Sequence, residues 1–386
     1  MGDSAHVPLC LTTSRDFSEY AVNIRIPSHL LPSDGRFGSG PTKVRPEALD
    51  ALVRIGARYV GTSHRQSAVR DVVHRIRSGL AELFSIPDGY EVVLGNGGAT
   101  TFWDVAAFGL IDRRSQHLSF GAFSARFASV VAGMPHLEPP QVIESPPGTH
   151  PVPEPNPEVD FYALTHNETS TGVMMPLLRP GPGIVAVDAT SAAGALPVDM
   201  ETVDAYYFSP QKAFGADGGL WVALLSPAAI DRIEQIAATG RALPPSLNLE
   251  SALRNSRLDQ TLNTPSLITL FLLETQINWM IEQGGLSWAV ERCRSMSSLV
   301  YEWADRASYA SVFVEDRAMR SPVTVTIDFT VDVAAVSKAL RSNGILDTEA
   351  YRKLGRNQLR IGTWPATDPA DVEALLASIE YVVDHL

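Results

Sequence analysis

Two kinds of apolar spacing alternate along the chain. Apolar residues that recur every three or four positions predict helices, and short continuous apolar runs bounded by glycine or proline predict buried strands. The helical pattern covers residues 54–59, 69–84, 99–110, 265–280, 286–304, 333–343 and 369–386. The strand pattern covers residues 91–94, 117–120, 159–165, 183–187, 205–208, 323–329 and 358–361. Apolar strands that alternate with helices predict an α/β fold with a mostly parallel sheet covered on both faces.

The pattern changes in two places. A proline-dense stretch at 135–157 predicts an irregular surface connection, because proline interrupts both helices and sheets. The strands and helices after residue 265 predict a smaller α+β domain packed on the first. We therefore expect an N-terminal arm at 1–36, a large domain at 37–265 and a small C-terminal domain at 266–386.

The composition is typical of a globular protein of enzyme size. The 386 residues are 45% hydrophobic, and 31 basic against 43 acidic residues give a formal net charge of -12 at pH 7. This charge repels phosphate backbones and anionic membrane surfaces, so no nucleic-acid partner is expected. No stretch approaches the roughly 20 apolar residues of a membrane span, and the first residues lack a signal-peptide pattern. We therefore expect a cytoplasmic protein without a membrane segment.

Cysteine and lysine are both scarce. Cys10 and Cys293 have no further Cys or His at metal-ligand spacing, so no metal site is expected. Lysine occurs at only four positions, which are Lys43, Lys212, Lys338 and Lys353. Any chemistry based on lysine therefore has four candidates.

Asp188 and Lys212 each follow a predicted strand of the sheet. Ligands of open α/β sheets bind at the carboxyl ends of the strands, so both side chains lie where chemistry is expected. A carboxylate after four apolar residues needs a cation or strong donors, and a protonated pyridine nitrogen is one such partner, although a helix N-cap is the alternative. Burial near a cationic ring would lower the pKa of Lys212 and let it attack an aldehyde, whereas a lone lysine at such a turn is usually a surface residue. The pairing of the two residues favours the chemical interpretation.

The glycine turn before the predicted helix at 99–110 is a candidate anion site. In Gly97-Gly98-Ala99-Thr100 the backbone amides can approach an anion at a helix start, where the helix dipole also favours negative charge. Thr100 stands where the dinucleotide motif G-x-G-x-x-G has its third glycine, and tight packing alone is the alternative reading. Phe123, after the strand at 117–120, can stack on a ring ligand or belong to the core.

Several separated motifs occur in an order typical of one enzyme family. They are Phe37-Gly-Ser-Gly-Pro41, Ser63-His-Arg65, Gly97-Gly-Ala-Thr100, His166-Asn-Glu-Thr169, Val187-Asp188, Gln211-Lys212 and Asn263-Thr-Pro265. From about residue 37 to residue 386, the chain resembles the class V aminotransferases and, within them, the phosphoserine aminotransferases. The resemblance implies the aspartate-aminotransferase-like fold type I of pyridoxal-phosphate (PLP) enzymes, with a mostly parallel seven-stranded sheet in the large domain.

The resemblance also implies roles in cofactor binding. Lys212 would form the Schiff base to PLP and act as general base, and Asp188 would pair with the pyridine nitrogen. Phe123 would stack on the ring and Thr169 would touch the cofactor. The residues that would hold the cofactor phosphate are Ala99, Thr100 and Gln211. Asn263 and Thr264 would reach the cofactor phosphate of a neighbouring subunit, so a homodimer with active sites at the subunit interface is expected.

Five residues are implied as substrate ligands. They are Ser39, His64, Arg65, Arg352 and Arg360. Arg360 would clamp the α-carboxylate, because a planar guanidinium binds a carboxylate bidentately. From the residues alone, Arg360 could equally be a strand arginine that faces solvent, and His64 a turn histidine. Tyr351-Arg352 stands near where many members have a His-Arg pair, and Thr100 where an arginine is often found, which indicates divergent substrate recognition.

The expected reaction transfers the amino group between L-glutamate and 3-phosphohydroxypyruvate, giving O-phospho-L-serine and 2-oxoglutarate. The pathway would be serine biosynthesis, with vitamin B6 biosynthesis as a second role. Two alternatives stay open. One is a serine- or alanine-glyoxylate aminotransferase of the same class, whose substrates lack a phosphate. The other is a non-catalytic nucleotide-binding α/β protein, which leaves Asp188 and Lys212 unexplained.

Overall fold

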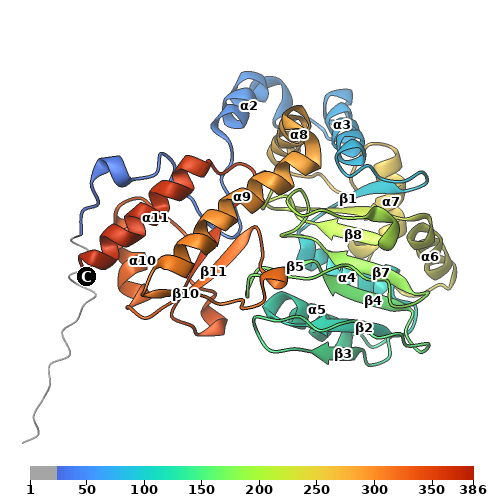
Figure 1. The fold of residues 1–386 in the computed structure, drawn as a ribbon. Coiled ribbons are helices and arrows are strands. Elements are labelled where there is room, and N and C mark those ends of the chain that lie inside the picture. The colour runs from blue at the N-terminus through green and yellow to red at the C-terminus, as the bar shows by residue number, and fades with distance from the viewer. Residues whose placement is uncertain (1–23) are drawn as a thin grey trace, which may run out of the picture.

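The computed structural model describes residues 24–386, so part of the predicted arm, together with Cys10, lies outside the described residues. Its main feature is a seven-stranded sheet, which runs from β1, below α3 and α8 in Figure 1, to β3 near the bottom. In spatial order the strands are β1 (Glu91–Asn96), β9 (Leu220–Leu225), β8 (Ala205–Phe208), β7 (Ile184–Asp188), β4 (Phe161–Thr165), β2 (Ser115–Ser119) and β3 (Gln141–Glu144). In this sheet β9 runs in the opposite direction to the other six strands. The predicted mostly parallel seven-stranded sheet is confirmed.

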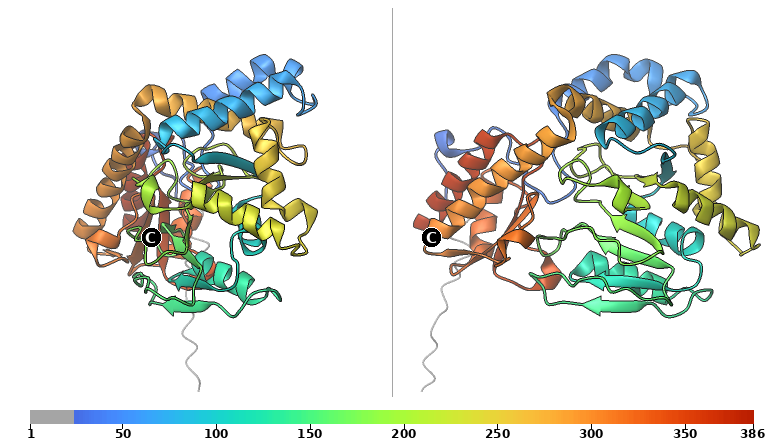
Figure 2. Two further views of the ribbon diagram at one scale, coloured as in Figure 1. Left: turned by 90° about the vertical axis from the view of Figure 1, so that its right-hand side faces the viewer. Right: turned by 45° about the vertical axis from the view of Figure 1, so that its right-hand side comes forward.

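Helices cover both faces of this sheet because its strands are buried on both sides. On β7, Val185 and Val187 belong to one apolar core, while Ile184 and Ala186 belong to the other, as the alternation of side chains along a strand requires. The first core is closed by α2 (Pro46–Tyr59), α3 (Ser67–Leu83) and α8 (Leu267–Gln283). The second core is closed by α4 (Ala99–Gly109), α5 (Ala122–Ala132), α6 (Pro227–Ala238) and α7 (Leu249–Arg257). Figure 2 shows the two helical layers from two further directions.

The second domain is a smaller sheet with helices, as predicted. Its antiparallel strands are β10 (Ala310–Val312), β11 (Thr324–Phe329) and β12 (Gln358–Gly362). Its helices are α9 (Gly285–Arg306), α10 (Val333–Ser342) and α11 (Pro369–Asp384). Ile26 and Phe37 from the start of the described chain are buried in this same core, and α8 packs in the core of the large domain. The predicted domain limits at 36/37 and 265/266 stay predictions.

The remaining elements are short. The hairpin of β5 (Asn167–Glu168) and β6 (Val173–Met174) follows β4 and faces the small domain. The 3-10 helices are η1 (Ser28–Leu30), η2 (Met200–Thr202), η3 (Pro245–Leu247), η4 (Arg317–Met319) and η5 (Arg352–Leu354).

One sequence-based expectation is wrong. The stretch 135–157 was expected to hold no regular element, but Gln141–Glu144 forms β3 and pairs in parallel with β2. This position is tolerated because β3 is the edge strand of the sheet and its own four residues include no proline.

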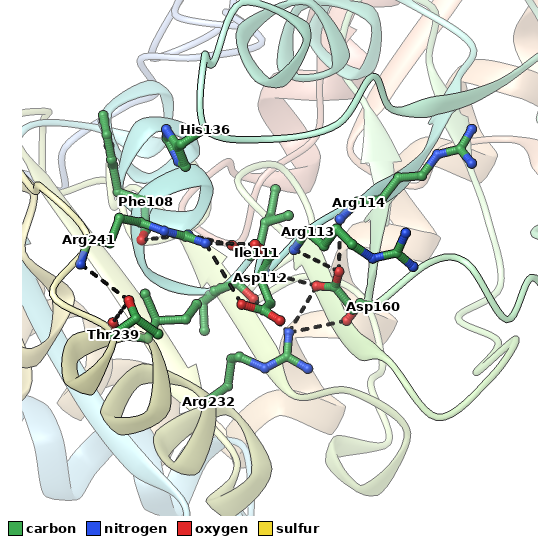
Figure 3. Close-up of polar contacts among 12 residues, drawn as sticks. Phe108, Ile111, Asp112, Arg113, Arg114, His136, Asp160, Arg232, Thr239 and Arg241 are labelled. Atoms are coloured by element: carbon green, nitrogen blue, oxygen red, sulfur yellow. Dashed lines mark hydrogen bonds and ion pairs between the residues drawn. The ribbon is translucent and has the colours of Figure 1, made fainter.

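The amino end of β4 is fixed by a network of charged residues (Figure 3). Asp160, the residue before β4, accepts backbone N–H bonds from residues 112, 113 and 114 at 2.8–2.9 Å and an ion-paired bond from Arg232 at 3.0 Å. Arg241 donates to the carbonyls of Ile111 and Asp112 at 2.7 and 2.6 Å, just beyond the C-terminus of α4. These hydrogen bonds pair backbone N–H and C=O groups that would otherwise lack a partner at the ends of the helices and strands.

Within residues 24–386, no helix is long and apolar enough to cross a membrane.

Candidate active site

A cavity of about 340 Å³ opens at the carboxyl ends of β4 and β7. Nine of the predicted site residues line it, and they come from both domains and from the segment before α2. They are Ser39, Ala99, Thr100, Phe123, Thr169, Asp188, Gln211, Lys212 and Arg360. A larger cleft of about 940 Å³ lies between the hairpin β5–β6 and α9, but its lining includes none of these nine residues.

Lys212 is buried in this cavity, with 7% of its surface exposed. Its Nζ donates to Thr169 Oγ1 at 2.6 Å, and that hydroxyl donates to Ser191 Oγ at 2.9 Å. Burial, aided by the charge of Arg360, lowers the pKa of Lys212 to about 8, although the charges of Asp188 and Glu168 act in the opposite direction. The lysine therefore becomes a neutral amine at a lower pH than an exposed lysine does.

Glycine is required next to this lysine. Gly40 has a positive φ of 124°, and a Cβ added there would lie 2.8 Å from Lys212 Cε. A side chain at residue 40 would therefore displace the lysine chain.

Asp188 ends β7 and is also 7% exposed. Its Oδ1 accepts the backbone N–H of Thr190 and its Oδ2 accepts the indole N–H of Trp103, both at 3.0 Å. Residues 190–195 form turns, so the alternative of an N-cap for a following α-helix does not hold. A buried carboxylate with two donors is a suitable partner for a cationic ring nitrogen.

The start of α4 lies at the cavity, and its role as an anion site stays a prediction. Ala99 and Thr100 occupy the first turn of α4, where backbone N–H groups have no partner within the helix. Gly97 has a φ of 108°, and a Cβ there would lie 2.4 Å from Thr101 Oγ1, so the turn requires glycine. Gln211 faces the same cavity.

Phe123 and Arg360 also line the cavity. Lys212 Nζ lies 5.6 Å from the centre of the half-buried Phe123 ring, so this phenylalanine is not purely a core residue. Arg360, on β12, donates to the Thr169 carbonyl at 3.1 Å, and its guanidinium carbon lies 5.5 Å from the Tyr351 ring centre. Burial lowers the pKa of Arg360. This arginine faces the cavity and not solvent, so the alternative of a solvent-facing strand arginine does not hold.

The cavity walls contain polar atoms that lack partners. Buried polar groups in folded proteins are nearly always paired, yet five of the thirteen unpaired buried side-chain atoms in the described residues belong to residues that line this cavity. They are Ser39 Oγ, Asn167 Oδ1, Thr190 Oγ1, Gln211 Oε1 and Arg360 Nε. Their concentration fits a polar ligand that carries both acceptors and donors. PLP, with its phosphate, hydroxyl and ring nitrogen, fits this set.

The other predicted residues lie elsewhere. Arg352 lines an adjoining cavity of about 550 Å³, which Ser39 and Arg360 also line. His64 Nδ1 and Thr264 Oγ1 lie 3.1 Å apart, and Asn263 N donates to Asn96 Oδ1 at 3.3 Å. We call the group of His64, Arg65, Asn263 and Thr264 the rim cluster. None of these four residues lines the cavity around Lys212.

Several residues that line or support the site were not predicted, and three of them bind predicted residues or the element that carries one. Trp103 binds Asp188, Ser191 binds Thr169, and Glu168 accepts backbone N–H bonds at the start of α5. Glu168 lies within a quoted motif, and a carboxylate in a run of apolar and small polar residues is a signal that could have identified it. Trp103 and Ser191 carry no comparable signal.

The described residues contain no group of three or more His, Cys, Asp or Glu side chains that could hold a metal ion.

Comparison with known proteins identifies the family. The aminotransferase class-V family model matches residues 155–348. A phosphoserine aminotransferase from Nocardioides sp. is 56% identical over 370 residues, covering 94% of this chain and 99% of that protein. A phosphoserine aminotransferase from Rhodococcus jostii is 55% identical over 366 residues, covering 94% and 98%.

Solved structures share the fold. A phosphoserine aminotransferase from Cytophaga hutchinsonii aligns with a TM-score of 0.84 at 24% identity, covering 90% of this chain and 99% of that one. An alanine-glyoxylate aminotransferase from Nostoc sp. aligns with a TM-score of 0.75 at 19% identity, covering 93% and 98%. The shared fold therefore does not separate these two kinds of aminotransferase, whereas both of the full-length relatives at 55–56% identity are named phosphoserine aminotransferases. The chain belongs to the class V aminotransferases and, within them, to the phosphoserine aminotransferase family.

Proposed function

We propose that the protein is a PLP-dependent phosphoserine aminotransferase, which transfers the amino group between L-glutamate and 3-phosphohydroxypyruvate. The products are 2-oxoglutarate and O-phospho-L-serine. The observation that carries the proposal is the buried Lys212, which shares one cavity with Asp188, Arg360 and a helix N-terminus. The relatives at 55–56% identity bear this name, and the similarity covers nearly their whole length.

PLP supplies an aldehyde that an amine can bind and a ring that accepts the electron pair of the substrate α-carbon. In the proposed site Lys212 would hold this group covalently, Asp188 would pair with the ring nitrogen, and Phe123 would support one face of the ring. The first turn of α4, at Ala99 and Thr100, would hold the phosphate together with Gln211.

Lys212 also serves as the base of the reaction. Its pKa of about 8 leaves part of the amine neutral near physiological pH, so Nζ can accept a proton from the substrate α-carbon. The hydroxyl of Thr169, 2.6 Å from Nζ, fixes the position of the amine. Thr169 in turn is held by Ser191, so the base is supported by a buried chain of hydrogen bonds.

Arg360 binds the α-carboxylate of the substrate in this proposal. Its guanidinium is already aligned by the Thr169 carbonyl and the Tyr351 ring, while Nε has no partner. A planar fork of N–H donors with free positions matches a carboxylate. Ser39 adds a hydroxyl next to it.

The substrate phosphate binds further out. Arg352 and the next residue, Lys353, line the cavity that adjoins Arg360. Two positively charged side chains therefore lie on this side of the site. We propose that His64 and Arg65 of a second subunit complete the phosphate site.

A homodimer explains the rim cluster. The described chain has nine exposed large apolar residues, and five of them lie on or beside the segments that carry the rim cluster. One of these five is Val53, which is 81% exposed. The five are Leu49, Val53, Val60, Leu258 and Ile268. Exposed apolar side chains of this density favour a subunit interface. In the proposed dimer, Asn263 and Thr264 reach the cofactor phosphate of the other subunit, and the enzyme acts in the cytoplasm in serine biosynthesis.

The deciding experiment combines the purified protein with PLP and glutamate and offers three amino acceptors in parallel. We expect O-phosphoserine from 3-phosphohydroxypyruvate, with much slower turnover of hydroxypyruvate and glyoxylate, which lack the phosphate. Lys212→Ala should abolish transfer, whereas Lys338→Ala, at an exposed position on α10, should leave it unchanged. Equal rates with glyoxylate would favour the glyoxylate-type alternative, and no PLP binding would refute the proposal.

A further inference from the structure

Trp103 connects two parts of the proposed cofactor site. It lies on α4, one helical turn after Ala99 and Thr100, and its indole N–H donates to Asp188 Oδ2 at 3.0 Å. Trp103 and Asp188 are 85 positions apart in the sequence. The helix that is proposed to hold the phosphate therefore also carries a donor to the carboxylate that faces the ring nitrogen.

The position of the indole is tightly constrained. Trp103 is 2% exposed and stacks on Phe127 of α5 with ring centres 5.7 Å apart and an interplanar angle of 14°. A close-packed aromatic ring cannot turn its N–H elsewhere without moving its neighbours. The packing of the ring therefore holds the donor on Asp188.

The two donors to Asp188 define the plane of its carboxylate. Thr190 N–H binds Oδ1 and Trp103 Nε1–H binds Oδ2, both at 3.0 Å, so the group cannot rotate without losing one bond. An ionised carboxylate can accept about four hydrogen bonds, so acceptor sites remain open toward the cavity. Both donors also offset part of the cost of burying the charge.

We propose that Trp103 is a positioning residue that holds the carboxylate of Asp188 in orientation for the ring nitrogen of PLP. This inference rests on the proposed function, because it assigns Trp103 a role toward the same cofactor. Trp103 itself touches neither the amino group nor the substrate carboxylate in this assignment, and it acts through Asp188.

The test is a double-mutant cycle on PLP affinity, measured by equilibrium dialysis. Trp103→Phe keeps an aromatic ring but removes the N–H, and it should raise the Kd for PLP about tenfold, which corresponds to about 1.4 kcal/mol. In an Asp188→Ala background the same change should alter the Kd by less than about twofold, because the group that Trp103 acts through is gone. In steady-state kinetics with saturating PLP, Trp103→Phe should lower kcat and leave the KM for glutamate unchanged, because Arg360 is untouched.

Trp303→Phe is the matched control. Trp303 is 3% exposed, and its indole donates to Glu380 Oε1 at 2.9 Å within the small domain, so it loses the same kind of bond away from the cavity. This variant should bind PLP like wild type. A tenfold loss for Trp103→Phe that persists without Asp188, or an equal loss for Trp303→Phe, would show a packing role and overturn the inference. An unchanged Kd for Trp103→Phe would overturn it as well. Wild type is measured first, since a wild-type protein that binds no PLP would refute the proposed function and this inference together.

Discussion

Replacing Glu168 by glutamine should destabilise the protein by about 3 kcal/mol, although the change removes no heavy-atom volume. Glu168 has no exposed surface. One carboxylate oxygen accepts the backbone N–H of Phe123 and of Ser124 at 3.2 and 2.9 Å and the hydroxyl of Ser124 at 3.0 Å. The other oxygen accepts the N–H and the hydroxyl of Ser170 at 3.1 and 2.7 Å. Glu168 thus satisfies the start of α5, which carries Phe123.

The magnitude follows from these five bonds. Glutamine can keep its carbonyl on the two amides of α5, but hydrogen bonds to a neutral acceptor are each weaker by about 1 kcal/mol than those to a charged one. Its amide group then faces the Ser170 N–H, which is left unpaired at a cost of about 2 kcal/mol. The Ser170 hydroxyl can rotate and accept instead. The lower cost of burying a neutral side chain offsets part of the sum, which leaves about 3 kcal/mol.

The assay is urea unfolding of the apoprotein, with wild type and variant compared at unchanged slope. Glu138→Gln is the control, because Glu138 is an exposed partner of Arg113 and its loss should cost less than about 1 kcal/mol. A Glu168→Gln midpoint that coincides with that of Glu138→Gln would refute the reasoning. Because the Glu168 charge raises the pKa of Lys212, the variant should also show a lower pKa for that lysine.

Three further predictions concern the lysine, its neighbouring glycine and the far end of the sheet. In the apoprotein the rate at which Lys212 captures PLP should rise with pH and level off above about 8, because the neutral amine is the reactive form and its pKa is lowered; a rise that continues toward the ordinary lysine value of 10.5 would contradict this. Gly40→Ala should weaken PLP binding by displacing Lys212, whereas Gly61→Ala, which also has a positive φ but no atom within 4 Å of the added Cβ, should only lower the thermal midpoint. Asp160→Asn should lower the unfolding free energy by about 2 kcal/mol, because an amide cannot accept all four N–H groups, and turnover per folded molecule should not change.

The local part of the fold was predictable from the sequence. The runs that end at Asp188 and before Lys212 are continuous and apolar, so their burial as strands and the place of both residues at strand ends follow from neighbouring residues alone. β9 was not predicted, although Leu220–Leu225 is wholly buried. Its antiparallel place between β1 and β8 depends on pairing with distant segments, which apolar spacing does not report.

The residues of the candidate site were likewise predictable only where a local motif in the sequence indicated them. Residues next to a motif could be proposed from that motif, whereas the bond between Trp103 and Asp188 depends on how α4 packs on the sheet. The grouping of His64 with Thr264 likewise joins positions 200 residues apart. Such contacts are properties of the tertiary packing, and the sequence carries no local sign of them.

Two segments, one near the start and one near the end of the described chain, are joined next to the proposed substrate site. Gly362 N donates to the Phe37 carbonyl at 2.7 Å, and Trp364 Nε1 donates to the Gly38 carbonyl at 2.9 Å, which places Ser39 close to the strand of Arg360. During synthesis on the ribosome, every strand of the large sheet emerges before residue 362 does, so most of the large-domain core can form first. The segment around Phe37 finds its partners only when the last part of the chain is released. A nascent or C-terminally truncated chain would therefore have a folded cofactor half and no substrate clamp, so that amino transfer begins only with the completed protein.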